Sequence, residues 1–106
     1  MDDPRLRFYS ELDDETAKYW LTFVRPQSTA SQLTKLTYTA YMHHPLAYLV
    51  CTKDQALFPD FQRAMIDVAK KQGLTVDVYE TDADHSPWLS REAETIEVIN
   101  KVVAAL

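Results

Sequence analysis

Residues 46–80, LAYLVCTKDQALFPDFQRAMIDVAKKQGLTVDVYE, contain two strand-like segments with a helix-like segment between them. The first, residues 46–51, is a continuous apolar run of the kind expected for a strand buried on both faces of a parallel sheet. The second, residues 74–80, is rich in strand-forming residues. Because a helix between two strands usually connects parallel neighbours through a right-handed crossover, this stretch predicts a strand–helix–strand unit.

The connecting helix is expected to have Pro59 in its first turn and Gly73 just past its end, where a left-handed conformation is common. Its apolar residues recur at helical spacing, so we expect this face to be buried, with Phe61, Met65 and Val68 each contributing about 1.5–3 kcal/mol before entropy is subtracted. The face comprises Phe61, Ala64, Met65, Val68 and Ala69.

The segments outside this unit are predicted to be helical. Residues 13–24 start with acidic residues and have apolar residues at helical spacing, while residues 28–38 favour a shorter helix capped by Ser28. A last helix begins at a Ser90 cap and has an apolar stripe of Ile96, Ile99, Val102, Val103 and Leu106. The order helix, helix, strand, helix, strand, helix indicates an α/β fold.

Composition limits the possible functions. A chain of 106 residues fits one domain, and a net charge of −5 with no basic stripe argues against nucleic acid as a partner. Cys51 is the only cysteine, which excludes an intrachain disulfide. No apolar segment has the length of a signal peptide or a membrane span, so we expect a cytoplasmic protein without membrane contact.

Glycine usage is also informative. Gly73 is the only glycine, which excludes a phosphate-cradling loop, a dinucleotide fingerprint and a Gly-x-Ser-x-Gly nucleophile elbow within this sequence. We therefore expect no cofactor.

Two side chains suited to proton transfer follow the predicted strands. Asp54 lies just past the carboxyl end of the first strand, and His85 lies in the loop TDADHSPWLS after the second. Since carboxyl ends of parallel strands meet at one edge, the two side chains can form a pair although they are distant in sequence. A carboxylate bonded to one imidazole nitrogen orients the ring and leaves the other nitrogen free to move a proton.

At these residues the chain resembles the C-terminal part of α/β-hydrolase fold proteins, especially the small esterase and hydroxynitrile-lyase-like branch and its fungal relatives. The resemblance rests on YLVCTKDQALFPDFQRAMIDVAKKQG and VYETDADHSPWLS, and it implies that Asp54 is the triad acid and His85 the triad base. It implies a single partial domain over residues 1–106, truncated to the last two parallel strands with flanking helices. Residues 1–44 would be helices derived from the cap and the return to the core, and residues 45–106 would carry the acid and the histidine.

The chain departs from the family pattern at the nucleophile. In this fold the serine precedes the acid in sequence, yet Ser10, Ser28 and Ser31, the serines before Asp54, have no flanking glycine and no strand-to-helix context. We expect no nucleophile in this sequence.

Other residues have weaker claims to a role. Trp88 is a candidate for substrate binding, with a core anchor for the final helix as the alternative. We expect no metal site: His43 and His44 should point to opposite sides of an extended segment, and the acidic residues at Asp82 and Asp84 should be solvated.

Two functions remain open. The first is small-molecule acid–base chemistry of lyase, cyclase or isomerase type by Asp54 and His85, with ester hydrolysis if another chain supplies the nucleophile. The second is a non-catalytic interaction or ligand-binding module. Because a two-stranded sheet has unpaired edges, we expect a homodimer or a complementary hydrolase chain as partner.

Overall fold

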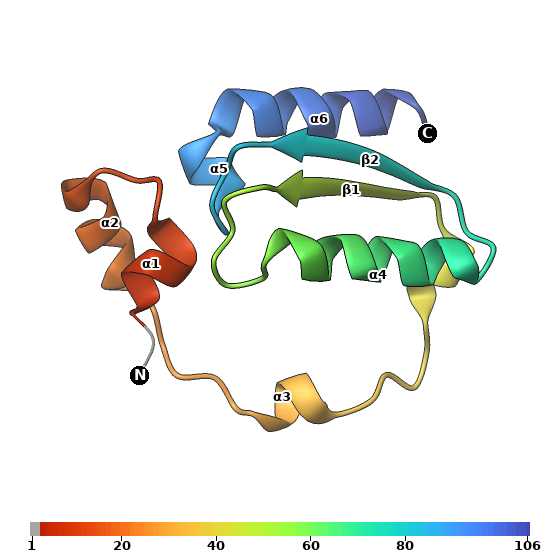
Figure 1. Ribbon diagram of the computed structural model, residues 1–106, viewed down its shortest axis with the longest axis horizontal. Helices are drawn as coiled ribbons and strands as arrows, with labels where there is room; N and C mark the ends of the chain where they lie inside the picture. Colours follow the sequence, from red (N-terminus) through yellow and green to blue (C-terminus); the bar gives the residue numbers. More distant parts are fainter. Residues whose placement is uncertain (1–2) are drawn as a thin grey trace.

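A computed structural model describes residues 3–106 and confirms the parallel strand pair (Figure 1). Strand β1 (Leu46–Cys51) pairs with β2 (Val76–Thr81) in parallel, in a register that sets Leu46 opposite Val76 and Cys51 opposite Thr81. Helix α4 (Pro59–Lys71) connects them. The α/β architecture predicted from the sequence is therefore correct.

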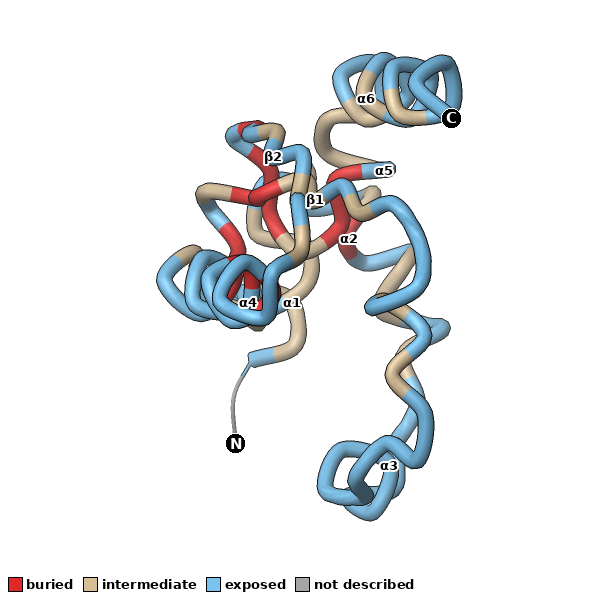
Figure 2. Tube along the Cα trace, turned by 90° about the vertical axis from the view of Figure 1, so that its right-hand side faces the viewer, coloured by how far each residue is buried: buried red, intermediate tan, exposed pale blue. Residues whose placement is uncertain are grey.

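Helices cover opposite faces of this small sheet (Figure 2). Arg63 of α4 forms an ion pair with Glu80 at 3.2 Å, whereas Glu94 of α6 (Glu92–Ala104) accepts a hydrogen bond from the Thr81 hydroxyl. Because successive side chains of a strand point to opposite faces, these contacts place α4 on one face and α6 on the other. The sheet is thus the middle layer of three.

The ends of α4 follow the prediction, but its buried face does not. Pro59 occupies the first turn, and Gly73 after the helix has φ +87°. Of the predicted face, Ala69 is buried as expected, whereas Phe61, Met65 and Val68 are 62%, 46% and 54% exposed. The residues buried against the sheet are Gln62, Ile66 and Ala69. Two strands cover only a narrow stripe of a helix, so the neighbouring apolar stripe stays open.

A similar correction applies to β1 and α6. Only Val50 and Cys51 of β1 are buried, so this strand is not buried on both faces. Of the predicted C-terminal stripe, Ile96, Ile99 and Val103 of α6 are exposed, and so is Leu106 beyond the end of α6. The cause is again the narrow sheet, which has nothing beyond β1 to bury these side chains in the part of the chain that the structure describes.

The N-terminal part has shorter helices than predicted. Helix α1 (Pro4–Tyr9), which the sequence analysis missed, is capped by Asp3, whose carboxylate accepts the Arg5 N–H. Helix α2 (Asp14–Leu21) is capped by Asp13 and stops before the predicted end at residue 24.

The long segment before β1 has little helix. The predicted helix over residues 28–38 shrinks to α3 (Ala30–Leu33), which Ser28 does not cap, and a 3-10 turn, η1 (Ala40–His43), precedes β1. Residues 25–38 are exposed throughout, so no tertiary packing supports the weak helix-forming tendency of this threonine-rich segment.

The C-terminal part also differs at the predicted cap. A short helix, α5 (Pro87–Ser90), precedes α6, and Arg91 occupies the position before α6. The Ser90 hydroxyl instead donates to Asp84 Oδ1 at 2.9 Å. The Ser90 hydroxyl, which was expected to cap the last helix, is thus hydrogen-bonded to a buried carboxylate. No helix among residues 3–106 is long and apolar enough to cross a membrane.

Candidate active site

The loops after β1 and β2 continue the pairing of the strands. The N–H of Thr52 donates to the Thr81 carbonyl, and the N–H of Lys53 donates to the Ala83 carbonyl, both at 3.0 Å. These bonds fix the two loops side by side at the carboxyl edge of the sheet. Asp54 and His85 follow directly, each within two residues of a bonded partner.

Asp54 is buried and held by its own turn. Its Oδ1 accepts the N–H groups of Ala56 at 2.8 Å and Leu57 at 2.9 Å, and only 5% of the residue is exposed. Such a turn is typical of an aspartate that bonds the backbone two residues further on. It fixes one carboxylate oxygen and leaves Oδ2 directed elsewhere.

His85 lies against that second oxygen. Its Nδ1 is 2.9 Å from Asp54 Oδ2 and 3.1 Å from Oδ1. An ionised carboxylate only accepts hydrogen bonds, so the network assigns the ring proton to Nδ1. The imidazole is 38% exposed, and among residues 3–106 no hydrogen bond engages its Nε2. A nitrogen able to accept a proton therefore remains open at the carboxyl edge.

Asp84, beside the histidine, is fully buried, which corrects the expectation that it is solvated. Its Oδ1 accepts from the Ser86 N–H and the Ser90 hydroxyl, each at 2.9 Å, and its Oδ2 accepts from the Glu11 N–H at 3.0 Å. Since a buried carboxylate needs such partners, Asp84 ties both the histidine loop and the N-terminal segment to one point. Asp82 is exposed, as expected, and accepts from the Thr52 hydroxyl.

The N-terminal segment lies over this edge of the sheet. The ring of Phe8 is 5.5 Å from that of His85, centroid to centroid. The Glu11 carboxylate is 3.1 Å from Lys53 Nζ and 3.7 Å from Arg91 Nη2. Helix α1 and the turn after it therefore form one side of the candidate site, through contacts of Phe8 and Glu11 that the sequence analysis did not name.

Cys51, at the end of β1, is close to these carboxylates. Burial raises the pKa of its thiol to about 11, with a further contribution from the negative charges of Asp54 and Asp84. A thiol that stays protonated at neutral pH is a poor nucleophile. The environment of Cys51 is therefore that of a packing residue.

Among residues 3–106, no hydrogen bond or ring contact joins the remaining candidates to the pair. Trp88 is 59% exposed, which rules out the alternative of a core anchor, and its role in substrate binding stays a prediction. His43 stacks on Tyr38 with ring centroids 5.5 Å apart, and His44 is exposed. Among residues 3–106 no group of three or more His, Cys, Asp or Glu side chains is arranged to hold a metal ion.

Among the residues that the sequence analysis missed, Asp84 had a detectable signal. An aspartate two residues before a serine, followed by Pro87, is a turn pattern in which the carboxylate accepts a backbone N–H. Phe8 and Glu11 had no such signal, because their contacts join positions far apart in the chain.

Comparison with known proteins supports one family. A sequence model of the alpha/beta hydrolase family matches residues 1–98. The chain is also similar to "Probable hydrolase R7" of Phoma sp. (strain ATCC 20986 / MF5453), with 37% identity over 73 residues, which are 68% of this chain and 30% of that protein. The chain thus covers 30% of the length of this curated relative. No solved structure shows significant similarity to the chain.

Proposed function

The chain belongs to the alpha/beta hydrolase family, and we propose that Asp54 and His85 are the acid and base of a site that moves protons on a small carbonyl compound or ester. The observation that carries this proposal is the 2.9 Å contact between His85 Nδ1 and Asp54 Oδ2. The two backbone bonds to Oδ1 hold the carboxylate, so it orients the imidazole at little further entropic cost.

The proton acceptor in this proposal is His85 Nε2. When it takes a proton, the ring becomes positively charged, and the Asp54 carboxylate stabilises that charge across the Nδ1 bond. When the reaction is complete, the same nitrogen returns the proton. This cycle requires no nucleophile on the chain and suits lyase, cyclase or isomerase chemistry.

Ester hydrolysis is proposed only with a nucleophile from another chain. The sequence contains serines at positions 10, 28, 31, 86 and 90, and no serine hydroxyl within residues 3–106 is hydrogen-bonded to His85. The name of the relative from Phoma sp., a probable hydrolase that is much longer than this chain, is compatible with that route.

Turnover by matched histidine variants tests the proposal. We expect the protein to accelerate α-proton exchange in a small ketone, and we expect His85→Ala to reduce this rate about 10²–10⁴-fold. Asp54→Asn should also reduce it, because the ring loses its orienting carboxylate.

The control is His44→Ala, because His44 is an exposed histidine outside the site. It should leave the exchange rate unchanged, and circular dichroism should show all variants folded. Equal rates in the wild type and in His85→Ala would contradict the proposal and favour a non-catalytic module.

A further inference from the structure

Among residues 3–106, two backbone N–H groups on the edge of β1 that faces away from β2 have no hydrogen-bond partner. Thr52 donates toward β2, whereas the N–H and C=O of Cys51 bond the side-chain amide of Gln62, at 3.0 and 3.1 Å. The N–H and C=O groups of successive residues point alternately to the two edges of a strand. Those of Leu49 and Ala47 therefore also point away from β2. Pro45, the next in this series, has no N–H. The open edge is therefore centred on Tyr48.

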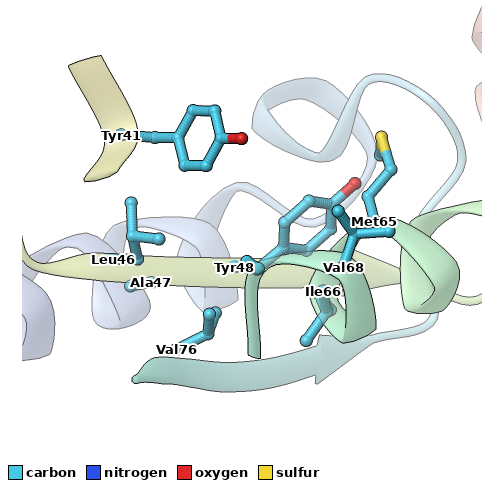
Figure 3. A pocket seen from close by; sticks show the side chains of 9 residues that line it. Tyr41, Leu46, Ala47, Tyr48, Met65, Ile66, Val68 and Val76 are labelled. Atoms are coloured by element: carbon cyan, nitrogen blue, oxygen red, sulfur yellow. The ribbon is translucent and has the colours of Figure 1, made fainter. Parts of the chain in front are cut away.

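Apolar grooves flank this edge on both faces of the sheet. One, of about 440 Å³, lies between β1 and α4 and is lined by Tyr48, Met65 and Val68 among others (Figure 3). The other, of about 310 Å³, lies between β1 and α6, where Ile99 and Val103 line it. Both grooves reach Ala47 and Tyr48. An added strand would therefore find apolar surface for side chains on each of its faces.

The chain exposes more surface than a compact monomer of its mass would, and the excess is large enough for an interface with a partner. The accessible surface measures 7983 Å² for a 12.2 kDa chain, whereas a compact monomer of this mass is expected to have roughly 6,100 Å². The difference of roughly 1,900 Å² is about twice the 800 Å² that each partner contributes to a standard interface. Part of it belongs to the exposed residues 25–38, and exposed apolar side chains of α4 and α6 supply another part, among them Met65, Val68, Ile99 and Val103.

We propose that a second copy of this chain occupies the edge, with the two β1 strands antiparallel about a two-fold axis at Tyr48. In this register Ala47 of each copy forms a hydrogen-bonded pair with Leu49 of the other, so the open N–H groups of both strands are satisfied. The two Tyr48 residues then form a non-hydrogen-bonded pair with Cα atoms about 4.5 Å apart. The bonds between Cys51 and Gln62 remain undisturbed.

The distance expected between the α4 helices of the two copies also supports a second copy at this edge. Each α4 lies over its own strand pair, so across the axis two α4 helices are separated by about two strand spacings, or roughly 9.6 Å. That distance falls within the 8–10 Å at which helices pack. The exposed Met65 and Val68 of one α4 would meet those of the other, and Ile99 and Val103 would do the same for α6 on the opposite face. A four-stranded sheet with a helix pair on each face results.

Sedimentation of two Ala47 variants tests the interface. Ala47→Pro removes an N–H that points away from β2 and so preserves the β1–β2 ladder, while Ala47→Ser retains the N–H. At 50–100 µM we expect wild type and Ala47→Ser at twice the 12.2 kDa chain mass, and Ala47→Pro at the monomer mass. A monomeric wild type, or a dimeric Ala47→Pro, would overturn the proposal. A monomeric wild type would favour a strand of another protein as the partner of this edge.

Disulfide formation tests the register. In a Cys51→Ser background, Tyr48→Cys should give a covalent dimer on mild oxidation, because its Cα separation suits a disulfide. Ala47→Cys is the control, since its copies would be diagonal neighbours about 7–8 Å apart. Equal or faster cross-linking of Ala47→Cys would contradict the register. Neither measurement depends on the chemistry of Asp54 and His85.

Discussion

Asp54 and Asp84 perform matching tasks in the two loops at the carboxyl edge of the sheet. Each uses Oδ1 to accept the N–H two residues further on, and each directs Oδ2 to a group far away in sequence. For Asp54 that group is His85, 31 positions away, and for Asp84 it is the N–H of Glu11, 73 positions away. One carboxylate orients the candidate base, and the other attaches the N-terminal segment beside it.

Replacement of Asp84 by its amide should detach that segment. In Asp84→Asn, the amide oxygen would remain with the Ser86 N–H and the Ser90 hydroxyl, so the NH₂ group would face the Glu11 N–H and leave two donors opposed. We expect a loss of about 1–3 kcal/mol in the free energy of unfolding and faster hydrogen exchange at Glu11. Asp82→Asn, at an exposed position, is the control, and equal exchange in both variants would argue against the tether.

The thiol of Cys51 predicts a loss of stability at alkaline pH. Its pKa rises from the ordinary 9.0 to about 11 in the folded chain because of burial and nearby carboxylates. Between these values the unfolded chain releases this proton while the folded chain keeps it, so the free energy of unfolding falls as the pH rises. Urea unfolding from pH 8 to 11 should show a steeper fall in the wild type than in Cys51→Ala; parallel curves would refute this.

At the scale of single elements, Gln62 closes the unpaired edge of β1 at the carboxyl end of the strand. Its amide satisfies both backbone groups of Cys51 and donates to the Leu57 carbonyl at 2.7 Å, while only 2% of the residue is exposed. Gln62→Ala should therefore cost about 1–3 kcal/mol for each group left unpaired, a total of roughly 2 kcal/mol or more. Urea unfolding measures this, with the exposed Gln72→Ala as control. A change below 0.5 kcal/mol, roughly that of an ordinary surface substitution, would show that water replaces the amide.

The elements predicted best are those with strong local signals. The apolar run of β1, Pro59 at the start of α4 and Gly73 after it all act through their own backbone preferences, and each appears where the sequence placed it. Helical spacing also identified α4 and α6. It could not tell which stripe of α4 would be buried, because that depends on the width of the sheet, which spacing within one helix does not contain.

Only part of the candidate site could be predicted from the sequence. Strand ends place Asp54 and His85 together once the two strands are known to be parallel, although their catalytic role stays a prediction. The contacts of Phe8, Glu11 and Asp84 depend on how the N-terminal segment returns to the sheet. No local pattern specifies that return, so the derivation of residues 1–44 from a cap also stays a prediction.

At the scale of the molecule, the described chain has a small core for its surface. The buried apolar residues are Ala17, Val50, Cys51, Ile66, Ala69 and Ala83. Small side chains predominate among them, while larger apolar side chains lie exposed on α4 and α6. Such a fold gains little from burial within one copy, so association should contribute a large share of its stability.

Thermal unfolding at different concentrations measures that share. If folding is coupled to dimerisation, each tenfold increase in protein concentration adds about 1.4 kcal/mol to the stability of the folded state. We therefore expect the Tm to rise steadily between 5 and 500 µM, and to rise less for Ala47→Pro than for Ala47→Ser. A Tm that is independent of concentration in the wild type would show that one copy is stable alone.

The proposed site depends on Asp54, which orients His85 with the proton on Nδ1 and leaves Nε2 free to accept another. ¹⁵N NMR of the histidine ring at a pH where it is neutral measures this directly. We predict the Nδ1–H tautomer in the wild type. In Asp54→Asn the amide oxygen would stay with the Ala56 and Leu57 N–H groups and the NH₂ would face Nδ1, so the proton should move to Nε2. An Nε2–H tautomer in the wild type, or the same tautomer in both proteins, would contradict this role of Asp54.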